Sequence, residues 1–559
     1  MNLNQITRSL LRDKLNSAVI IISLSAGITC INLIFLFLWR EINTDGFQKG
    51  KDQIYALTCD DPWIPGARMY YCRFGAAEYM KNNFPQVLDF CRFNNSNPIK
   101  VIVNNEDYFS NSNIIAATKN FFSFFSYRLL TNNPENALEG ADNIVISSDL
   151  AKKYFGTADP VGKIIKLINR TNTKEMTVTG VFEKPVENTQ ISFDMVRLIG
   201  EADGRCYVKL AKDTDPLKLE KLFSEKKDVI PVINTGTPGQ YYLKPFQKAY
   251  FDTSRSWTVE INRDKKDLLI ALIIGLMILS IAVFNYLGVL TNKFHRKVKE
   301  YYIRRINGSS VNNLIVRFTV ENSILVLLSF VISIFLMTDA LPFFNRITGS
   351  TITDRFISQP EQIILLLMVL VFVLFMTIIF DLFLIKRNLN INLLKTDRVI
   401  TLRSIEIPVF NILQIAGSIG LIICSLVIIR QMNFISAKPI GLDKAVIEIK
   451  IPPQYSDKAA AFKDRLLKNS SIKNVSITSA SPLLEHFLLA LKYDDNGSQK
   501  EYFPAGFSGD ENYLDVLGIE LLQGTGFSET KAPNTKKCLI NQSFAKLFTG
   551  RDLLGKGIP

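Results

Sequence analysis

The sequence predicts a multi-pass α-helical membrane protein that carries α+β domains outside the cytoplasm. Five stretches of the 559-residue chain lack charged residues, and each is close to the roughly 20 residues that a helix needs to cross a bilayer. Long polar blocks between these stretches contain β-branched runs and helix caps, which indicate folded domains. This segregation excludes a purely soluble enzyme, a disordered chain and a fibrous repeat.

The predicted spanning helices follow the charge-free stretches. The longest of these are Leu15–Trp39, Leu268–Leu290 and Ile407–Ile429. Asn322–Thr338 and Gln362–Phe380 are shorter, but apolar flanks extend both. The spans are predicted at 16–38, 267–290, 317–340, 362–385 and 408–430.

The segment 1–15 ahead of the first span is predicted to be an amphipathic helix on the cytoplasmic membrane surface. Leu3, Ile6 and Leu10 can share one helical face, with basic residues such as Arg12 nearby. The alternative is a frayed basic tail. The first span is longer than the 7–15 apolar residues of a signal peptide, so we expect it to remain as an anchor.

The distribution of Lys and Arg predicts the orientation. Basic residues concentrate ahead of the first span and in the loops 291–316 and 386–407, whereas the loop 341–361 carries only Arg346 and Arg355. Because loops rich in Lys and Arg stay in the cytoplasm, the N-terminus is predicted to be cytoplasmic and the two large polar blocks to lie outside. The net charge of +13 then reflects topology, and no nucleic-acid partner is expected.

The first large block, 40–265, is predicted to be an α+β domain. Gly75–Asn83 suits a short helix, and Asp215 with the following proline is typical of a helix start. Ser147 or Ser148 is expected to cap another helix, which a glycine ends. Strands are predicted at Val101–Val103, Ile114–Ala117, Thr177–Val181 and Tyr207–Leu210.

The second block, 431–559, repeats the pattern of the first. Residues 145–156 align without gaps with 539–550, and 120–122 align with 512–514. A helix is therefore expected after a short strand in both blocks, and the ordered series predicts a duplicated unit of one span and one outer domain. Since the chain stops just after the second copy of this pattern, we expect a C-terminally truncated sequence whose complete form has about three more spans.

The chain resembles the FtsX/MacB-type ABC transporter permease family over nearly its whole length. The motifs that carry the resemblance are Asp45-Gly46-Phe47 after the first span, Val178–Phe182 in the outer block, and Lys299–Ser310 after the second span. Two positions depart from the family pattern. Tyr301-Tyr302 replaces a usual Val-Gly, and Ile379–Leu382 stands where a Tyr-Pro-Ala turn is usual.

The resemblance implies a non-catalytic permease subunit of the bacterial inner membrane, with two periplasmic core domains of which the second, 431–559, is incomplete. Such permeases pair with a separate cytoplasmic ABC ATPase, which binds the ATP, so no cofactor is expected in this chain. Hydrolysis moves the periplasmic domains (mechanotransmission) and drives export or extraction of a macrolide, peptide or lipoprotein. A homo- or heterodimer of permeases in the lipid bilayer and a periplasmic adaptor or outer-membrane protein are the other expected partners.

The contact with the ATPase is predicted in the cytoplasmic loop 291–316. Its isoleucines can offer an apolar edge to a partner, and its arginines can pair with acidic partner residues. The alternative is an ordinary positive-inside loop. The residues assigned to ATPase coupling are Lys299, Glu300, Ile303, Arg304, Arg305, Ile306, Gly308, Ser309 and Ser310.

No catalytic, metal or cofactor site is predicted. Gly156–Ile164 lacks the spacing of a Walker A motif. His295 and His486 are the only histidines and are expected on opposite sides of the membrane, which excludes a zinc site built on several histidines. Within the spans, Asn285 is expected to make an interhelical hydrogen bond, and Glu321 to reach water or an arginine one turn earlier.

Four cysteines, Cys59, Cys72, Cys91 and Cys206, lie in the first outer block. One or two disulfides and buried free thiols are equally compatible with the sequence, and four cysteines allow three full pairings. Cys30 and Cys424 lie within predicted spans and are expected to be packing residues.

The alternative function classes each require a further feature. A membrane sensor or receptor with ligand-binding outer domains needs a cytoplasmic output module. A cell-envelope regulator of the same family normally has a single outer domain, whereas this chain has the duplicated pattern. A membrane-tethered enzyme needs a nucleophile–base or metal constellation outside the membrane. For such a constellation the sequence offers only carboxylate pairs such as Asp60-Asp61 as candidates.

Overall fold

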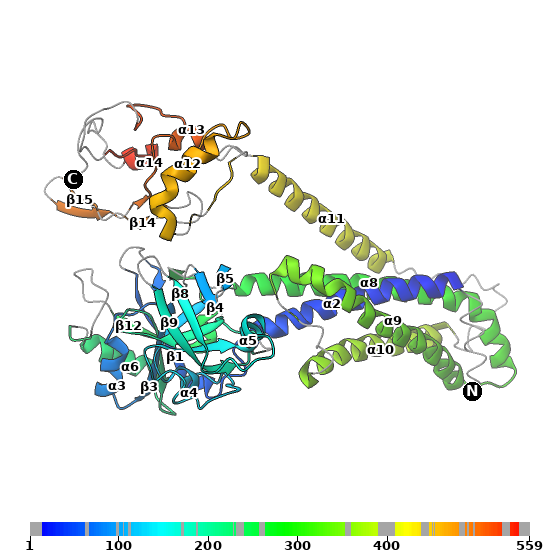
Figure 1. Cartoon of the computed structure of the whole chain (residues 1–559). Helices are drawn as coiled ribbons and strands as arrows, with labels where there is room; N and C mark the ends of the chain where they lie inside the picture. Colours follow the sequence, from blue (N-terminus) through cyan, green and yellow to red (C-terminus); the bar gives the residue numbers. More distant parts are fainter. Residues whose placement is uncertain are drawn as a thin grey trace.

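The computed structural model contains a large sheet domain, a bundle of long helices and a smaller second domain (Figure 1). Lys14 is the first and Lys546 the last of the residues that it describes. Between them the description omits 62–65, 97–99, 104–105, 110–112, 169–172, 186–187, 227, 231–239, 257–262, 351, 353–358, 389–407, 438–445, 450, 452, 480–486, 489–490, 496–497, 503 and 528–536. Most of the helix predicted over 1–15 and most of the loop predicted over 386–407 therefore lie outside the described residues.

Five long helices of the described chain are long and apolar enough to cross a membrane. Each contains one of the predicted spans. The first four run side by side as a bundle, and the fifth leads from the bundle to the second domain (Figure 1). They are α2 (Lys14–Ile42), α8 (Lys265–Ile306), α9 (Val311–Thr348), α10 (Pro360–Asn388) and α11 (Pro408–Ala437).

Two segments predicted as loops are largely helical. The expected loop 291–316 is the continuation of α8 and the start of α9 around a short turn, and α9 also extends through the first part of the expected loop 341–361. The reason is that charge marks the end of an apolar span but not of a helix. Beyond Lys293, α8 still buries Phe294 and Val298 against the neighbouring helices, which keeps it folded.

The sheet domain is built on one large mixed sheet in the strand order β13-β2-β1-β11-β3-β6-β10-β7-β9-β8-β4-β5, with β12 also paired to β1. Its strands are β1 (Ile54–Asp60), β2 (Arg68–Met69), β3 (Val87–Asn95), β4 (Lys100–Val103), β5 (Glu106–Phe109), β6 (Ile114–Ala117), β7 (Asn143–Ser147), β8 (Ile164–Ile168), β9 (Thr173–Phe182), β10 (Met195–Leu198), β11 (Arg205–Leu210), β12 (Tyr241–Pro245) and β13 (Arg255–Ser256). The four predicted strands are confirmed within β4, β6, β9 and β11.

Helices cover parts of this sheet (Figure 1). Ser147, rather than Ser148, caps α5 by accepting a hydrogen bond from the Leu150 N–H at 3.4 Å, and the helix ends at Gly156, whose φ is +62°. Asp215 caps α6 through the Leu217 N–H at 3.0 Å. The helices are η1 (Lys51–Gln53), α3 (Ala76–Asn83), α4 (Phe121–Phe124), α5 (Ser148–Phe155), α6 (Pro216–Glu225) and α7 (Phe246–Ala249).

The sheet domain has separate apolar cores on the two sides of its strands. Alternate residues of β1 and β11 face opposite sides, as the pleat requires. Tyr207 packs in an aromatic core, where its ring stacks on Phe93 at 5.6 Å. Cys206, its neighbour, belongs to the other core together with Cys59 and Cys72.

The second domain partly reproduces the pattern of the first. Asn541 caps α14 through the Phe544 N–H at 2.8 Å, at the position that aligns with the capping Ser147. No strand is assigned over 537–541 ahead of α14, because the exposed Leu539 and Ile540 pair with no strand among the described residues. The elements are η4 (Pro453–Lys458), α12 (Ala459–Leu467), β14 (Phe487–Leu488), β15 (Leu491–Asp495), β16 (Ser498–Tyr502), β17 (Ala505–Gly506), α13 (Tyr513–Leu517) and α14 (Gln542–Ala545).

Candidate functional site

The turn between α8 and α9 forms a tip at the end of the bundle that points away from the sheet domain (Figure 1). Gly308 has a φ of +92°, which a glycine adopts without strain. Ser310 caps α9 by accepting a hydrogen bond from the Asn313 N–H at 3.2 Å. Arg305 donates to the Ser309 carbonyl at 2.9 Å, so side chains as well as backbone fix the turn. We call the segment 299–310 the hairpin tip.

All nine residues assigned to ATPase coupling lie in the hairpin tip. Ile303 and Ile306 are 60% and 75% exposed and give the tip an apolar surface. Arg304 pairs with Glu300 one turn earlier at 2.9 Å. Exposed isoleucines beside a cation, on a turn fixed by its own bonds, are suited to binding another protein.

An aromatic cluster supports the hairpin tip from within. Tyr301 is buried between α8 and α9, with its ring 6.0 Å from Phe294 and 6.1 Å from Phe318. Leu384 from α10 belongs to the same cluster. Tyr301 stands where the resembling family usually has a valine, and here its larger ring fills the space between the two helices.

A buried ionic cluster lies next to this aromatic cluster, and sequence reasoning missed it. Lys293 and Glu321 form an ion pair at 3.0 Å, and both side chains are only 4% exposed. Lys297, one turn along α8, pairs with the same carboxylate at 2.7 Å. The expectation that Glu321 reaches water or a nearby arginine is therefore wrong: it bridges α9 to α8.

Asn322 extends the cluster to α10. Its side chain accepts a hydrogen bond from Lys293 at 3.0 Å and donates to both carboxylate oxygens of Asp381 at 3.1 Å. An interhelical amide bond of the kind predicted for Asn285 is made by Asn322 instead, and no side-chain hydrogen bond of Asn285 is found among the residues that the structure describes. The four-residue spacing of Lys293 and Lys297 was the available signal, because it puts both on one helical face.

At the opposite end of the bundle, polar bonds join α2 to the sheet domain. Asp45 is fully buried and accepts hydrogen bonds from Thr189 at 2.6 Å and from the Gln190 side chain at 2.9 Å. Its backbone N–H donates to the Asn188 carbonyl at 2.8 Å. Asp45 has a φ of +59°, which Asp tolerates better than most residues. The Asp45-Gly46-Phe47 motif is therefore a structural joint.

Glu41 completes this joint. It accepts a hydrogen bond from Tyr250 of the sheet domain and lies 3.6 Å from Arg263, which precedes α8. Arg263 in turn donates to the Thr348 carbonyl at the end of α9. Three helices and the sheet domain consequently meet at one small set of polar groups.

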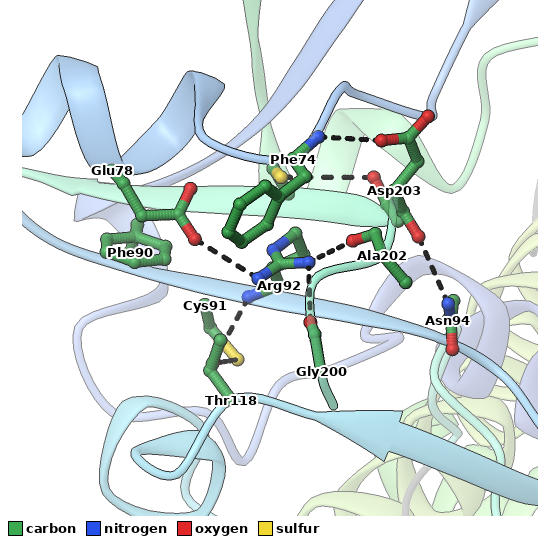
Figure 2. Close-up of polar contacts among 12 residues, drawn as sticks. Phe74, Glu78, Phe90, Cys91, Arg92, Asn94, Thr118, Gly200, Ala202 and Asp203 are labelled. Atoms are coloured by element: carbon green, nitrogen blue, oxygen red, sulfur yellow. Dashed lines mark hydrogen bonds and ion pairs between the residues drawn. The ribbon is translucent and has the colours of Figure 1, made fainter. Parts of the chain in front are cut away.

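Within the sheet domain, Arg92 is a buried cation with several hydrogen bonds (Figure 2). Its guanidinium donates to Glu78 at 3.2 Å and to the carbonyls of Gly200 and Ala202. It also lies 4.7 Å from the centre of the Phe74 ring. Arg92 therefore holds the segment before β11 against α3 and β3, which is a structural role.

The four cysteines of the sheet domain are buried free thiols. Burial raises the pKa of Cys91, and burial followed by the charges of Asp60 and Asp61 raises the pKa of Cys59 to about 12. Groups of His, Cys, Asp and Glu that could hold a metal ion are absent from the residues that the structure describes. His295 lies on α8 rather than in a loop, and His486 is outside the described residues.

Comparison with known proteins supports the resemblance. Residues 17–224 match the MacB-like periplasmic core domain family, which confirms the resemblance to MacB-type permeases for this part of the chain. No curated protein matches. A domain described as part of a permease protein from Porphyromonas gingivalis shares 20% identity, with 40% of this chain and 99% of that one covered and a TM-score of 0.31.

Two further solved structures are similar at lower identity. The periplasmic region of MacB from Actinobacillus actinomycetemcomitans is 14% identical, with 35% of this chain and 90% of that one covered and a TM-score of 0.27. The extracellular domain of the noncanonic ABC-type transporter YknZ from Gram-positive bacteria is 16% identical, with 34% and 98% covered and a TM-score of 0.26.

Proposed function

We propose that this chain, whose residues 17–224 match the MacB-like periplasmic core domain family, is the membrane subunit of an ABC-type transporter. The five apolar helices span the inner membrane, with the hairpin tip in the cytoplasm and the sheet domain and second domain in the periplasm. A separate ATPase binds and hydrolyses ATP, and this chain is not itself an enzyme. The permease works as a dimer, with a periplasmic adaptor or outer-membrane protein as a further partner.

The observation that carries this proposal is the hairpin tip. It combines exposed Ile303 and Ile306 with a fixed turn, at the end of the bundle that points away from the sheet domain (Figure 1). ATPase closure moves the tip, and the helices transmit the movement to the periplasmic domains through the Asp45 joint. The substrate is a macrolide, a peptide or a lipoprotein, on which the periplasmic domains act.

Co-purification of the full-length protein from membranes tests the ATPase contact. We expect an ABC ATPase to co-purify with the wild type and to be lost from the double variant I303S/I306S. The matched control is F343S/I347S, which removes two comparably exposed apolar residues at the other end of α9. Absence of an ATPase from the wild type, or its retention by I303S/I306S, would contradict the proposal. A sensor or receptor, the alternative, would purify without an ATPase.

Labelling of intact cells tests the topology. Lys152 on α5 and Lys546 after α14 are both exposed, and so is Lys299 in the hairpin tip. In a C538S background, we expect a membrane-impermeant maleimide to label K152C and K546C from the periplasmic side, and K299C only after lysis. Labelling of K299C in intact cells would reverse the proposed orientation.

A further inference from the structure

A polar layer crosses the bundle between two apolar clusters. On one side lies the large cluster of the helix bundle, which includes Leu290 and Val373. On the other side lies the aromatic cluster that supports the hairpin tip. Burial on both sides leaves the polar layer little access to water, so each of its groups depends on the others for hydrogen bonds. The layer consists of Lys293, Lys297, Glu321, Asn322 and Asp381.

The layer combines basic and acidic side chains. Two lysines from α8 face one carboxylate from α9 and one from α10. Asp381 is fully buried, and its two oxygens accept from the Asn322 amide rather than directly from a lysine. Removing one member of such a set leaves an uncompensated buried charge, which costs far more than a lost surface pair.

Asn322 is the element that makes the layer continuous. Its oxygen faces a cation on α8 and its nitrogen faces a carboxylate on α10, so the amide has one orientation that satisfies both neighbours. Without Asn322, the Lys293–Glu321 pair would join only α8 and α9. With it, α10 is held by charge-assisted bonds at the same level of the bundle.

We propose that Asn322 and Asp381 form an interhelical lock that fixes α10 to the α8–α9 hairpin, so that the hairpin tip and the end of α10 move as one body. Leu384 and Ile385 of α10 pack against the hairpin on the far side of the lock, which supplies the second point of attachment. Asn322 and Asp381 are thus positioning residues for the tip. The inference rests on the proposed function only in taking the tip as the ATPase contact.

Hydrogen exchange of the full-length protein in nanodiscs tests the lock. N322D places a second acidic group beside Asp381, and D381N removes the carboxylate that accepts from the Asn322 amide. The swap N322D/D381N restores one Asp and one Asn across the same pair and keeps the net charge. We expect each single variant to speed amide exchange over 294–318 and 380–388 about tenfold, and the swap to return it to within about twofold of the wild type.

D339N is the matched control, because it makes the same change at an exposed position of α9. We expect it to leave amide exchange unchanged throughout the protein. In every variant, exchange in the peptides of β7–β9, which lie in the sheet domain, should also stay unchanged. Unchanged exchange in both single variants, or a swap that exchanges as fast as they do, would overturn the lock. Should the single variants unfold globally, N322S removes the amide that bonds to Asp381 without adding a charge, and absence of a local increase there has the same meaning.

The co-purification assay separates the two proposals. If no ATPase co-purifies with the wild type but the exchange pattern is the expected one, the lock is supported and the proposed function is contradicted. If an ATPase co-purifies and depends on Ile303 and Ile306, but exchange is unchanged in N322D and D381N, the proposed function is supported and the lock is contradicted.

Discussion

Tyr250 of the sheet domain donates a hydrogen bond to Glu41, the buried carboxylate at the end of α2. Burial and then this bond raise the pKa of Tyr250 above its ordinary value. The phenol therefore stays protonated at neutral pH and remains a donor. Because Arg263 approaches Glu41 from the start of α8, this carboxylate links the domain to two helices.

Substitution of Tyr250 by Phe should weaken this joint. Y250F leaves Glu41 buried with one partner fewer, so we expect the free energy of unfolding to fall by about 1–3 kcal/mol. Chemical denaturation monitored in the sheet domain measures the change. Y242F is the matched control, because Tyr242 bonds to the exposed Asp60, and it should cost less than about 0.5 kcal/mol. Equal losses in the two variants would contradict a special role for Tyr250.

Asp252 should give the sheet domain an acid-sensitive contribution to stability. Burial alone would raise its pKa, but hydrogen bonds from Ser254, Tyr70 and Lys244 hold the pKa below the usual range. A carboxylate with a depressed folded pKa stabilises the fold above its unfolded pKa of about 4, and this contribution is lost as the pH falls below that value.

The variant D252N tests this linkage. At pH 7 we expect it to lower the free energy of unfolding by about 1–2 kcal/mol, and the difference from wild type should shrink as the pH falls below about 4. D213N, at an exposed position, should follow the wild type throughout. A difference between D252N and wild type that does not change with pH would show that the charge of Asp252 is not responsible.

Arg92 should contribute to stability through the several hydrogen bonds of its planar guanidinium group rather than through its charge alone. It bonds to Glu78 and to two carbonyls at once (Figure 2), and a lysine cannot reach all three. We expect R92A to lower the free energy of unfolding by about 3 kcal/mol and R92K by about 1–2 kcal/mol.

The exposed pair of Arg128 and Glu183 provides the control for Arg92. R128A should change the free energy of unfolding by less than about 0.5 kcal/mol, because surface ion pairs contribute little. If R92K were as stable as wild type in the same denaturation experiment, the charge alone would suffice and the forked geometry would be irrelevant.

Local features of this fold follow from the sequence. The cap at Ser147 and the helix end at Gly156 depend on a few adjacent residues, so both could be predicted. The position of the hairpin tip follows from the charge-free stretches on either side of it, whereas its assignment to ATPase coupling depends on the family resemblance. The continuity of α8 to Ile306 could not be predicted, because charge marks the end of an apolar stretch but not the end of a helix.

The polar layer of the bundle could not be predicted in this way. Asn285 and Asn322 are similar residues within apolar stretches, and only the packing of the helices decides which amide faces a lysine. Asp381 lies on a helix far along the chain from Lys293, and no periodicity within one helix reveals the pairing. Contacts between helices depend on their relative rotation, which single-helix patterns do not fix.

The state of the cysteines can be settled by alkylation and intact mass. Cys59, Cys72, Cys91 and Cys206 are buried, whereas Cys538 is exposed. Since burial raises the pKa of Cys59 to about 12, its thiol is protonated and shielded at pH 8, and the thiolate is the reactive form. We therefore expect a maleimide to modify Cys538 in the native protein and to leave these four thiols unmodified.

Denaturation without reductant then separates free thiols from disulfides. All seven cysteines of the chain should react once the fold is lost, and the mass should rise by seven adducts. Each disulfide would remove two adducts that only a reductant could restore. A count of five before reduction would therefore contradict the buried free thiols and identify one disulfide. The variant C538S should lose one adduct in both states, which assigns one native label to the second domain and separates it from any label on Cys30 and Cys424, which are also exposed.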